Sequence, residues 1–147
     1  MLTKDIQVNG VDLRLYKLSV FTQEKVINKL TKLIAPFFAL AKAKDKNMGE
    51  ALSQAFTQAL NDFTEQERHE LLFDILLSDK SVKLVVNGAE MPLIGNSGGV
   101  KCVMSDKLDD ISDLYEIAGE VFIFNFKRFF DKAQNCLKSI NPSKFVA

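Results

Sequence analysis

The chain has 147 residues, of which 47% are hydrophobic and 26% are charged, and its formal net charge is zero. These values are typical of one soluble globular domain, and the absence of a basic balance or an aromatic-basic motif argues against binding to nucleic acid. The N-terminal residues contain no apolar segment typical of a secretory signal. No uncharged run of about 18 residues occurs, so we expect no membrane-spanning segment.

The zero net charge is the sum of three charged blocks. Residues 1–46 carry nine Lys/Arg and four Asp/Glu, a net charge of +5. Residues 47–120 carry five Lys/Arg and fourteen Asp/Glu, a net charge of −9. Residues 121–147 carry five Lys/Arg and one Asp/Glu, a net charge of +4. Such blocks either neutralise one another within the fold or attract a partner, including a neighbouring copy of the chain.

Residues 1–18 are predicted to form a β-hairpin. Its turn is the Asn-Gly pair at 9–10, a dipeptide typical of two-residue hairpin loops. In that register Ile6 faces Leu13, and Asp5 lies opposite Arg14 as a favourable cross-strand charge pair.

Residues 22–79 are predicted to be helical. The first helix begins near Thr22 as its N-cap, and Pro36 is expected to kink or break it. A second helix is predicted at about 48–61. The third helix opens with a capping box at residues 64–67, Thr-Glu-Gln-Glu, and ends near residue 78.

Residues 81–104 are predicted to form a second hairpin followed by a flexible loop. The Asn-Gly pair at 87–88 places Leu84 opposite Met91, and Pro92 fits only an edge strand. The glycine-rich residues 95–99 are interpreted as the flexible connector to the last helix.

Residues 107–140 are predicted to form a long C-terminal helix. Its apolar positions step by three or four and place Phe122, Phe126 and Phe129 on one core-facing stripe. Phe124 and Phe130 lie off that stripe, so the middle of the helix is apolar on nearly every side. Such a helix needs a cover, either from its own fold or from another chain.

One polar residue, Asn125, interrupts the phenylalanine cluster. If it is buried, its amide must form hydrogen bonds, and a buried asparagine between helices can fix their register or the number of partners. Alternatively, it points at water. We take Asn125 and the five phenylalanines as the candidate partner-binding residues.

Together these elements predict a single domain over residues 1–147 of the α+β class. The chain is expected to be mainly α, with four or five helices, one or two small β-hairpins and a long C-terminal helix.

The sequence offers little for catalysis. His69 is the only histidine, and it lies on the polar side of its predicted helix, beside charged residues. No set of histidines, cysteines and carboxylates has metal-ligand spacing, and Cys102 and Cys136 are expected to be reduced thiols. We therefore expect no catalytic residues, no metal and no cofactor.

The order of these parts resembles the tail assembly chaperones of long-tailed bacteriophages. The resemblance rests on the N-terminal hairpin leading into Tyr-Lys-Leu-Ser-Val-Phe-Thr at 16–22, and on Phe-Thr-Glu-Gln-Glu-Arg at 63–68 before a leucine-rich helix. It also includes the final helix with Phe-Asn-Phe-Lys-Arg-Phe-Phe at 124–130. It covers nearly the whole chain, as a layout of elements and not as an invariant motif.

The resemblance implies a non-enzymatic protein of the infected host's cytoplasm that is absent from the finished virion. Proteins of this family bind the tape measure protein, a long helical chain, and keep it soluble while tail tube subunits polymerise around it. The tail tube protein is a further implied partner. The exposed members of the phenylalanine cluster, together with Phe37 and Phe38, would supply the apolar contacts.

Two other functions fit the same residues. The apolar helix could be the interface of a structural homo-oligomer from a phage or prophage, with charge blocks that pair between copies. The chain could also be a small inhibitor that sequesters another protein.

Overall fold

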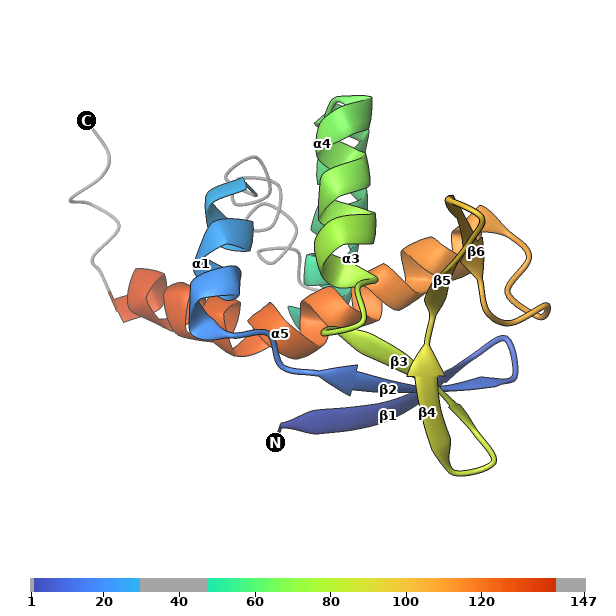
Figure 1. Ribbon diagram of the computed structural model, residues 1–147. Coiled ribbons are helices and arrows are strands. Elements are labelled where there is room, and N and C mark those ends of the chain that lie inside the picture. Colours follow the sequence, from blue (N-terminus) through green and yellow to red (C-terminus); the bar gives the residue numbers. More distant parts are fainter. Residues whose placement is uncertain (1, 30–47, 140–147) are drawn as a thin grey trace.

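The computed structural model describes residues 2–29 and 48–139 (Figure 1). Within these ranges the chain forms four α-helices, one π-helical segment and six strands. The long helix α5 (Ile111–Ser139) lies between the strands on one side and the upright helices on the other (Figure 1). The predicted contributions of Pro36, Phe37 and Phe38 lie outside the described residues.

Two hairpins build the larger sheet. Strands β1 (Thr3–Val8) and β2 (Val11–Tyr16) form the first hairpin, and β3 (Val82–Val86) and β4 (Ala89–Pro92) form the second. Both turns have the left-handed backbone that Asn-Gly favours, with φ of 51° and 78° in the first and 53° and 81° in the second.

The predicted registers of these hairpins are confirmed. Ile6 pairs with Leu13, and Leu84 pairs with Met91. The cross-strand charge pair also forms, with Arg14 Nε 2.8 Å from Asp5 Oδ1. Strand β4, which ends at its proline, is an edge strand, as the missing amide requires.

The prediction of a mainly helical chain with one or two small hairpins is wrong, because the strand content is larger. The two hairpins join through β2 and β3 into one antiparallel sheet of order β1-β2-β3-β4, pairing Leu13 with Leu84 and Leu15 with Val82. All four side chains are buried, so burial of apolar surface holds the two hairpins together.

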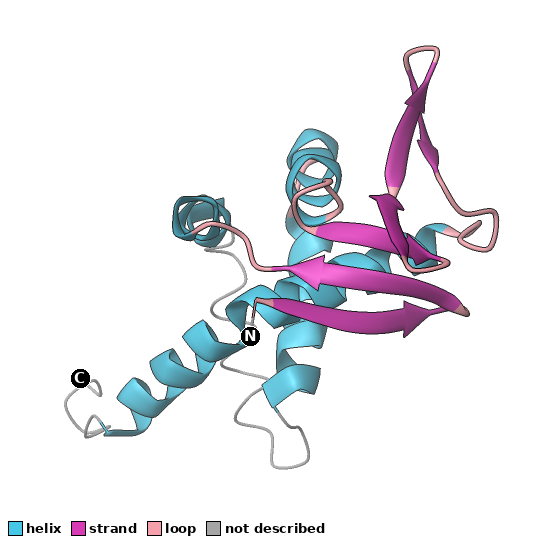
Figure 2. Ribbon diagram, turned by 60° about the horizontal axis from the view of Figure 1, so that its bottom comes forward, coloured by secondary structure: helices cyan, strands magenta, loops and turns pink. Residues whose placement is uncertain are grey.

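A third hairpin replaces the predicted flexible loop. Strands β5 (Ile94–Ser97) and β6 (Val100–Val103) pair across a Gly98-Gly99 turn and form a separate two-stranded sheet. Both glycines have positive φ, 59° and 84°, which is why the chain reverses within two residues. This hairpin projects from the rest of the fold (Figure 2).

Helix α1 (Val20–Lys29) begins two residues before the predicted start. The side chain of Ser19 caps it, because its Oγ accepts a hydrogen bond from Thr22 N at 3.2 Å. The predicted cap, Thr22, therefore lies inside the first turn. Val26 is the buried residue of this helix.

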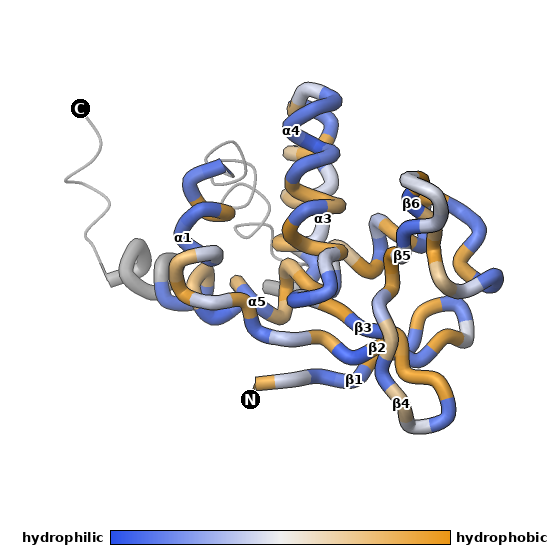
Figure 3. The backbone as a smooth tube through the Cα atoms, in the orientation of Figure 1, coloured by the Kyte–Doolittle hydropathy of each residue, from blue (hydrophilic) through white to orange (hydrophobic). Residues whose placement is uncertain are grey.

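Helices α3 (Met48–Asp62) and α4 (Glu65–His69) follow, and α4 continues into the π-helical segment η1 (Glu70–Leu76). The sequence predicted an ordinary helix here. Instead Leu77 N donates to Leu72 O at 2.7 Å, five residues back, so the turn is wider than an α-helical one. The polar sequence of α4 makes it one of the most hydrophilic parts of the tube in Figure 3.

The predicted capping box at the start of α4 is confirmed. Thr64 Oγ1 accepts from Glu67 N at 3.1 Å, and Glu67 Oε1 accepts from Thr64 N at 2.9 Å.

We expect Thr64→Ala to lower the free energy of unfolding by about 1 kcal/mol, because one first-turn amide loses its acceptor. Urea denaturation followed by circular dichroism measures this change. Thr57→Ala on α3 is the matched control, since Thr57 is exposed and bonds only the Ser53 carbonyl of its own helix. Equal stability losses in the two variants would mean that the capping box contributes nothing specific.

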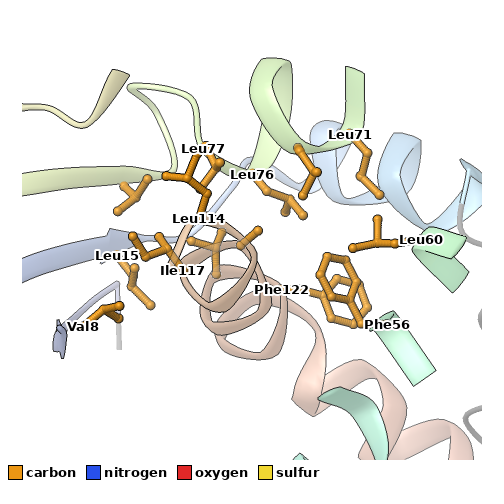
Figure 4. Close-up of a cluster of buried hydrophobic side chains, with 14 of the residues drawn as sticks. Val8, Leu15, Phe56, Leu60, Leu71, Leu76, Leu77, Leu114, Ile117 and Phe122 are labelled. Carbon is orange, nitrogen blue, oxygen red and sulfur yellow. The ribbon is translucent and has the colours of Figure 1, made fainter. Parts of the chain in front are cut away.

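Helix α5 packs against α3, η1, β1 and β2, so it is the central element of the core. Its first turn is capped by Asp110, whose Oδ1 accepts a hydrogen bond from Ser112 N at 2.8 Å. That bond lowers the pKa of Asp110. Figure 4 shows Ile117 and Leu114 of α5 near Leu15 of the sheet, and Phe122 near Phe56 of α3.

Candidate partner-binding surface

The five phenylalanines of α5 divide between core and surface. Phe122, Phe126 and Phe130 are buried, with exposed fractions of 0%, 1% and 1%. Phe124 is half-buried, and Phe129 is 48% exposed. Only Phe124 and Phe129 can therefore contact a partner in this structure.

The three buried rings form one cluster, and Phe122 joins it to α3. Phe122 stacks on Phe56, with ring centroids 4.8 Å apart and an interplanar angle of 19° (Figure 4). The same ring lies 5.0 Å from Phe126 and 6.3 Å from Phe130, both at tilted angles. This cluster belongs to the core, where aromatic pairs add to the burial of apolar area.

Asn125 is buried, which decides between the two placements that the sequence left open. Its Oδ1 accepts a hydrogen bond from Leu18 N at 2.7 Å, and its Nδ2 donates to Val121 O at 2.9 Å. The amide thus holds the segment between β2 and α1 against α5. Asn125 satisfies a backbone group inside the fold and offers nothing to a partner.

Phe124 lies beside the same segment. The Lys17 ammonium lies 4.5 Å from the Phe124 ring centroid and donates a hydrogen bond to the Phe124 carbonyl oxygen. The backbone N of Lys17 donates to Leu2 O at 3.2 Å. The backbone of Lys17 thus contacts Leu2, and its side chain contacts α5. Leu2 and Phe124 therefore lie at the same end of the molecule.

The most exposed large apolar side chains also lie at this end. Leu2, Val20 and Phe21 have exposed fractions of 80%, 75% and 83%. Val20 and Phe21 follow Lys17 by three and four residues and form the first turn of α1. We call Leu2, Val20, Phe21 and Phe124 the α1 surface.

Sequence reasoning missed most of the α1 surface, although one signal was present. Val26 is buried and Thr22 and Gln23 are half-buried, whereas Val20 and Phe21 are exposed. Val20 and Phe21 directly follow the cap residue Ser19 and lie outside the apolar stripe of α1 that contains Val26. Large apolar residues outside the core-facing stripe of a helix indicate an exposed apolar surface.

Comparison with known proteins decides the family. Residues 9–137, most of the chain, match the family described as phage tail assembly chaperone protein, TAC. The chain belongs to this family. No curated protein and no solved structure matches it. The family resemblance predicted from the sequence is therefore confirmed.

A small apolar hollow of this chaperone lies between η1, the β5–β6 hairpin and α5. Its volume is about 250 Å³, and Phe73, Ile94 and Leu114 contribute to its lining. His69 lies at this hollow, exposed as predicted, with its ring 4.9 Å from the Phe73 ring and its Nε2 3.4 Å from Lys101 Nζ. Among the residues that the structure describes, no serine, threonine or cysteine is hydrogen-bonded to this histidine.

Within residues 2–29 and 48–139, no group of three or more His, Cys, Asp or Glu residues could hold a metal ion. In the same ranges, none of the helices combines the length and hydropathy that crossing a bilayer requires. Membership of a chaperone family suggests a non-enzymatic role.

Proposed function

We propose that this tail assembly chaperone binds the tape measure protein and keeps it soluble in the host cytoplasm while the tail tube assembles. Family membership supports the chaperone role, and the α1 surface is the observation that carries the binding mode. Two adjacent large apolar side chains that are three-quarters or more exposed are costly in water, and their burial favours association with an apolar partner.

The chemistry of this surface suits a helical client. Val20 and Phe21 lie on a helical turn, so they can pack against the apolar stripe of an amphipathic helix. Complete burial of a phenylalanine side chain contributes about 1.5–3 kcal/mol. A few such contacts give an affinity high enough for protection and low enough for release. In this proposal the tail tube protein displaces the chaperone, which is then absent from the virion.

The test is co-expression with the tape measure protein of the same phage. We expect the wild-type chaperone to keep most of the client in the soluble fraction, and Phe21→Asp to lose most of that protection. A charge at this position removes about 1.5–3 kcal/mol of apolar contact, roughly a 10- to 100-fold loss of affinity. The thermal unfolding midpoint should not change, because Phe21 is 83% exposed.

Val86→Asp is the matched control. Val86 is 47% exposed and lies at the β3–β4 turn, on an element separate from the α1 surface. We expect this variant to protect the client as well as the wild type does. Full protection by Phe21→Asp, or an equal loss in both variants, would contradict the assignment of the α1 surface.

A further inference from the structure

A lysine-rich cleft lies beside the α1 surface, between α1 and η1. Its volume is about 600 Å³. This is within the range of roughly 300–1,000 Å³ that ligand pockets have, so it can hold several side chains of a partner but not a whole helix. The charged residues of the cleft lining are Lys17, Lys25, Lys29, Lys80, Glu70 and Asp74.

The two carboxylates of the cleft are already paired. Glu70 Oε2 lies 3.5 Å from Lys29 Nζ, and Asp74 Oδ1 lies 3.7 Å from Lys101 Nζ of the β5–β6 hairpin. Within the described residues, no carboxylate lies within ion-pair distance of Lys25 or Lys80. The cleft therefore has an excess of positive charge.

Lys17 adds a third ammonium group without a carboxylate partner. It bonds a carbonyl oxygen and lies over a ring, as described above, and these groups compensate a positive charge only in part. Burial, followed by the positive charge of Arg128, lowers the pKa of Lys17. An anion in the cleft would stabilise the charged form of this side chain.

The cleft adjoins the α1 surface along the chain. Ser19 and Thr22, which line the cleft, flank Val20 and Phe21 on the same turn of the chain. Successive residues of a helix point about 100° apart, so a ligand that covers Phe21 can reach the cleft on the neighbouring side of the same turn. The site combines the exposed Phe21 side chain with the ammonium and hydroxyl groups that line the cleft.

We propose that the cleft binds the acidic side of an amphipathic helical segment of the tape measure protein, whose apolar side covers Phe21. The inference rests on the proposed function and narrows it: among many helical segments, the chaperone selects those with glutamates or aspartates next to the apolar stripe. Charge complementarity supplies the selection, and apolar burial supplies most of the affinity.

Two synthetic helical peptides test this selection. They share one leucine stripe, and their polar faces carry either glutamate or lysine. We expect fluorescence anisotropy to show that the full-length chaperone binds the glutamate peptide at least about tenfold more tightly, because several partly exposed ion pairs add up. Raising the salt concentration should reduce this difference, since exposed charges are screened.

Charge reversal in the cleft provides the decisive variant. Lys25→Glu with Lys80→Glu should abolish or invert the preference between the peptides, because the excess charge of the cleft changes sign. Lys107→Glu with Lys127→Glu is the control, since it makes the same change in net charge at exposed positions that do not line the cleft. The control should keep the preference of the wild type.

Three results would overturn the inference. The wild type could bind both peptides equally, or the control could lose the preference as fully as the cleft variant does. The third result is self-association detected by light scattering without peptide and abolished by the cleft variant, which would make a second copy the occupant. The co-expression test with Phe21→Asp is independent, so protection of the client can hold while charge selection fails.

Discussion

Replacing Phe122 with alanine is expected to lower the free energy of unfolding by about 3–5 kcal/mol, the largest effect of any substitution considered for this protein. Phe122 is fully buried, stacks on Phe56 of α3 and lies near two other buried phenylalanines. Its removal leaves a cavity between α3 and α5 that these rings cannot fill without leaving their own contacts. Urea denaturation followed by circular dichroism measures the loss.

Phe129→Ala is the matched control in the same helix. Phe129 is 48% exposed and meets Phe130 edge-on, with centroids 5.3 Å apart, so we expect a loss below about 1 kcal/mol. If Phe122→Ala does not fold at all, Phe122→Leu keeps most of the buried volume and should be measurably destabilised. Equal losses for Phe122→Ala and Phe129→Ala would contradict the division of the phenylalanines between core and surface.

The second large effect is expected at Asn125. Asn125→Ala should cost about 2–3 kcal/mol, because Leu18 N then lies buried without its acceptor, and the cost of an unsatisfied buried group exceeds that of a lost exposed bond. The segment between β2 and α1 would also lose one of its connections to α5. Thermal unfolding measures the change in stability.

Two comparison variants make this prediction specific. Asn61→Ala, at an exposed position near the end of α3, should change stability by less than about 0.5 kcal/mol. Asn125→Asp keeps an oxygen acceptor for Leu18 N but loses the donor to Val121 O and buries a charge, so it should also be destabilised. If Asn125→Ala leaves the stability unchanged, a water molecule replaces the amide in solution, which would contradict this prediction.

The features predicted correctly from the sequence are local ones. The Asn-Gly turns, the registers next to them and the Thr64–Glu67 capping box each depend on residues that are a few positions apart. In these cases one backbone preference and the hydrophobic alternation indicate the same structure. The resemblance to a chaperone family also came from the order of such local parts.

The strand content was underestimated because it depends on pairing between distant segments. The contact of Leu13 with Leu84 joins residues from two hairpins, and nothing near either residue specifies the other. The third hairpin was missed for another reason. Its strands contain Asn, Ser and Lys beside glycines, which have weak strand preferences, and the Gly98-Gly99 turn was interpreted as a flexible loop.

Helical periodicity identified α5 but not which of its phenylalanines are exposed. The sequence placed Phe129 on the core-facing stripe and Phe130 off it, whereas Phe130 is buried and Phe129 is 48% exposed. Residues spaced by four drift about 40° around a helix, so Phe122, Phe126 and Phe130 turn progressively toward one side. Which side is covered depends on where neighbouring helices such as α3 lie, and the spacing within α5 carries no information on that.

The position of Asn125 has a consequence for how the protein is made. Leu18 leaves the ribosome early, yet its backbone N bonds a side chain that lies 107 positions later in the chain. Because the ribosome adds about 5–20 residues per second, Asn125 is synthesised several seconds after the N-terminal hairpin. Contacts of such long sequence separation slow folding, because a large loop must close first. We therefore expect the nascent chain to expose the face of its sheet that α5 later covers, which favours aggregation during synthesis.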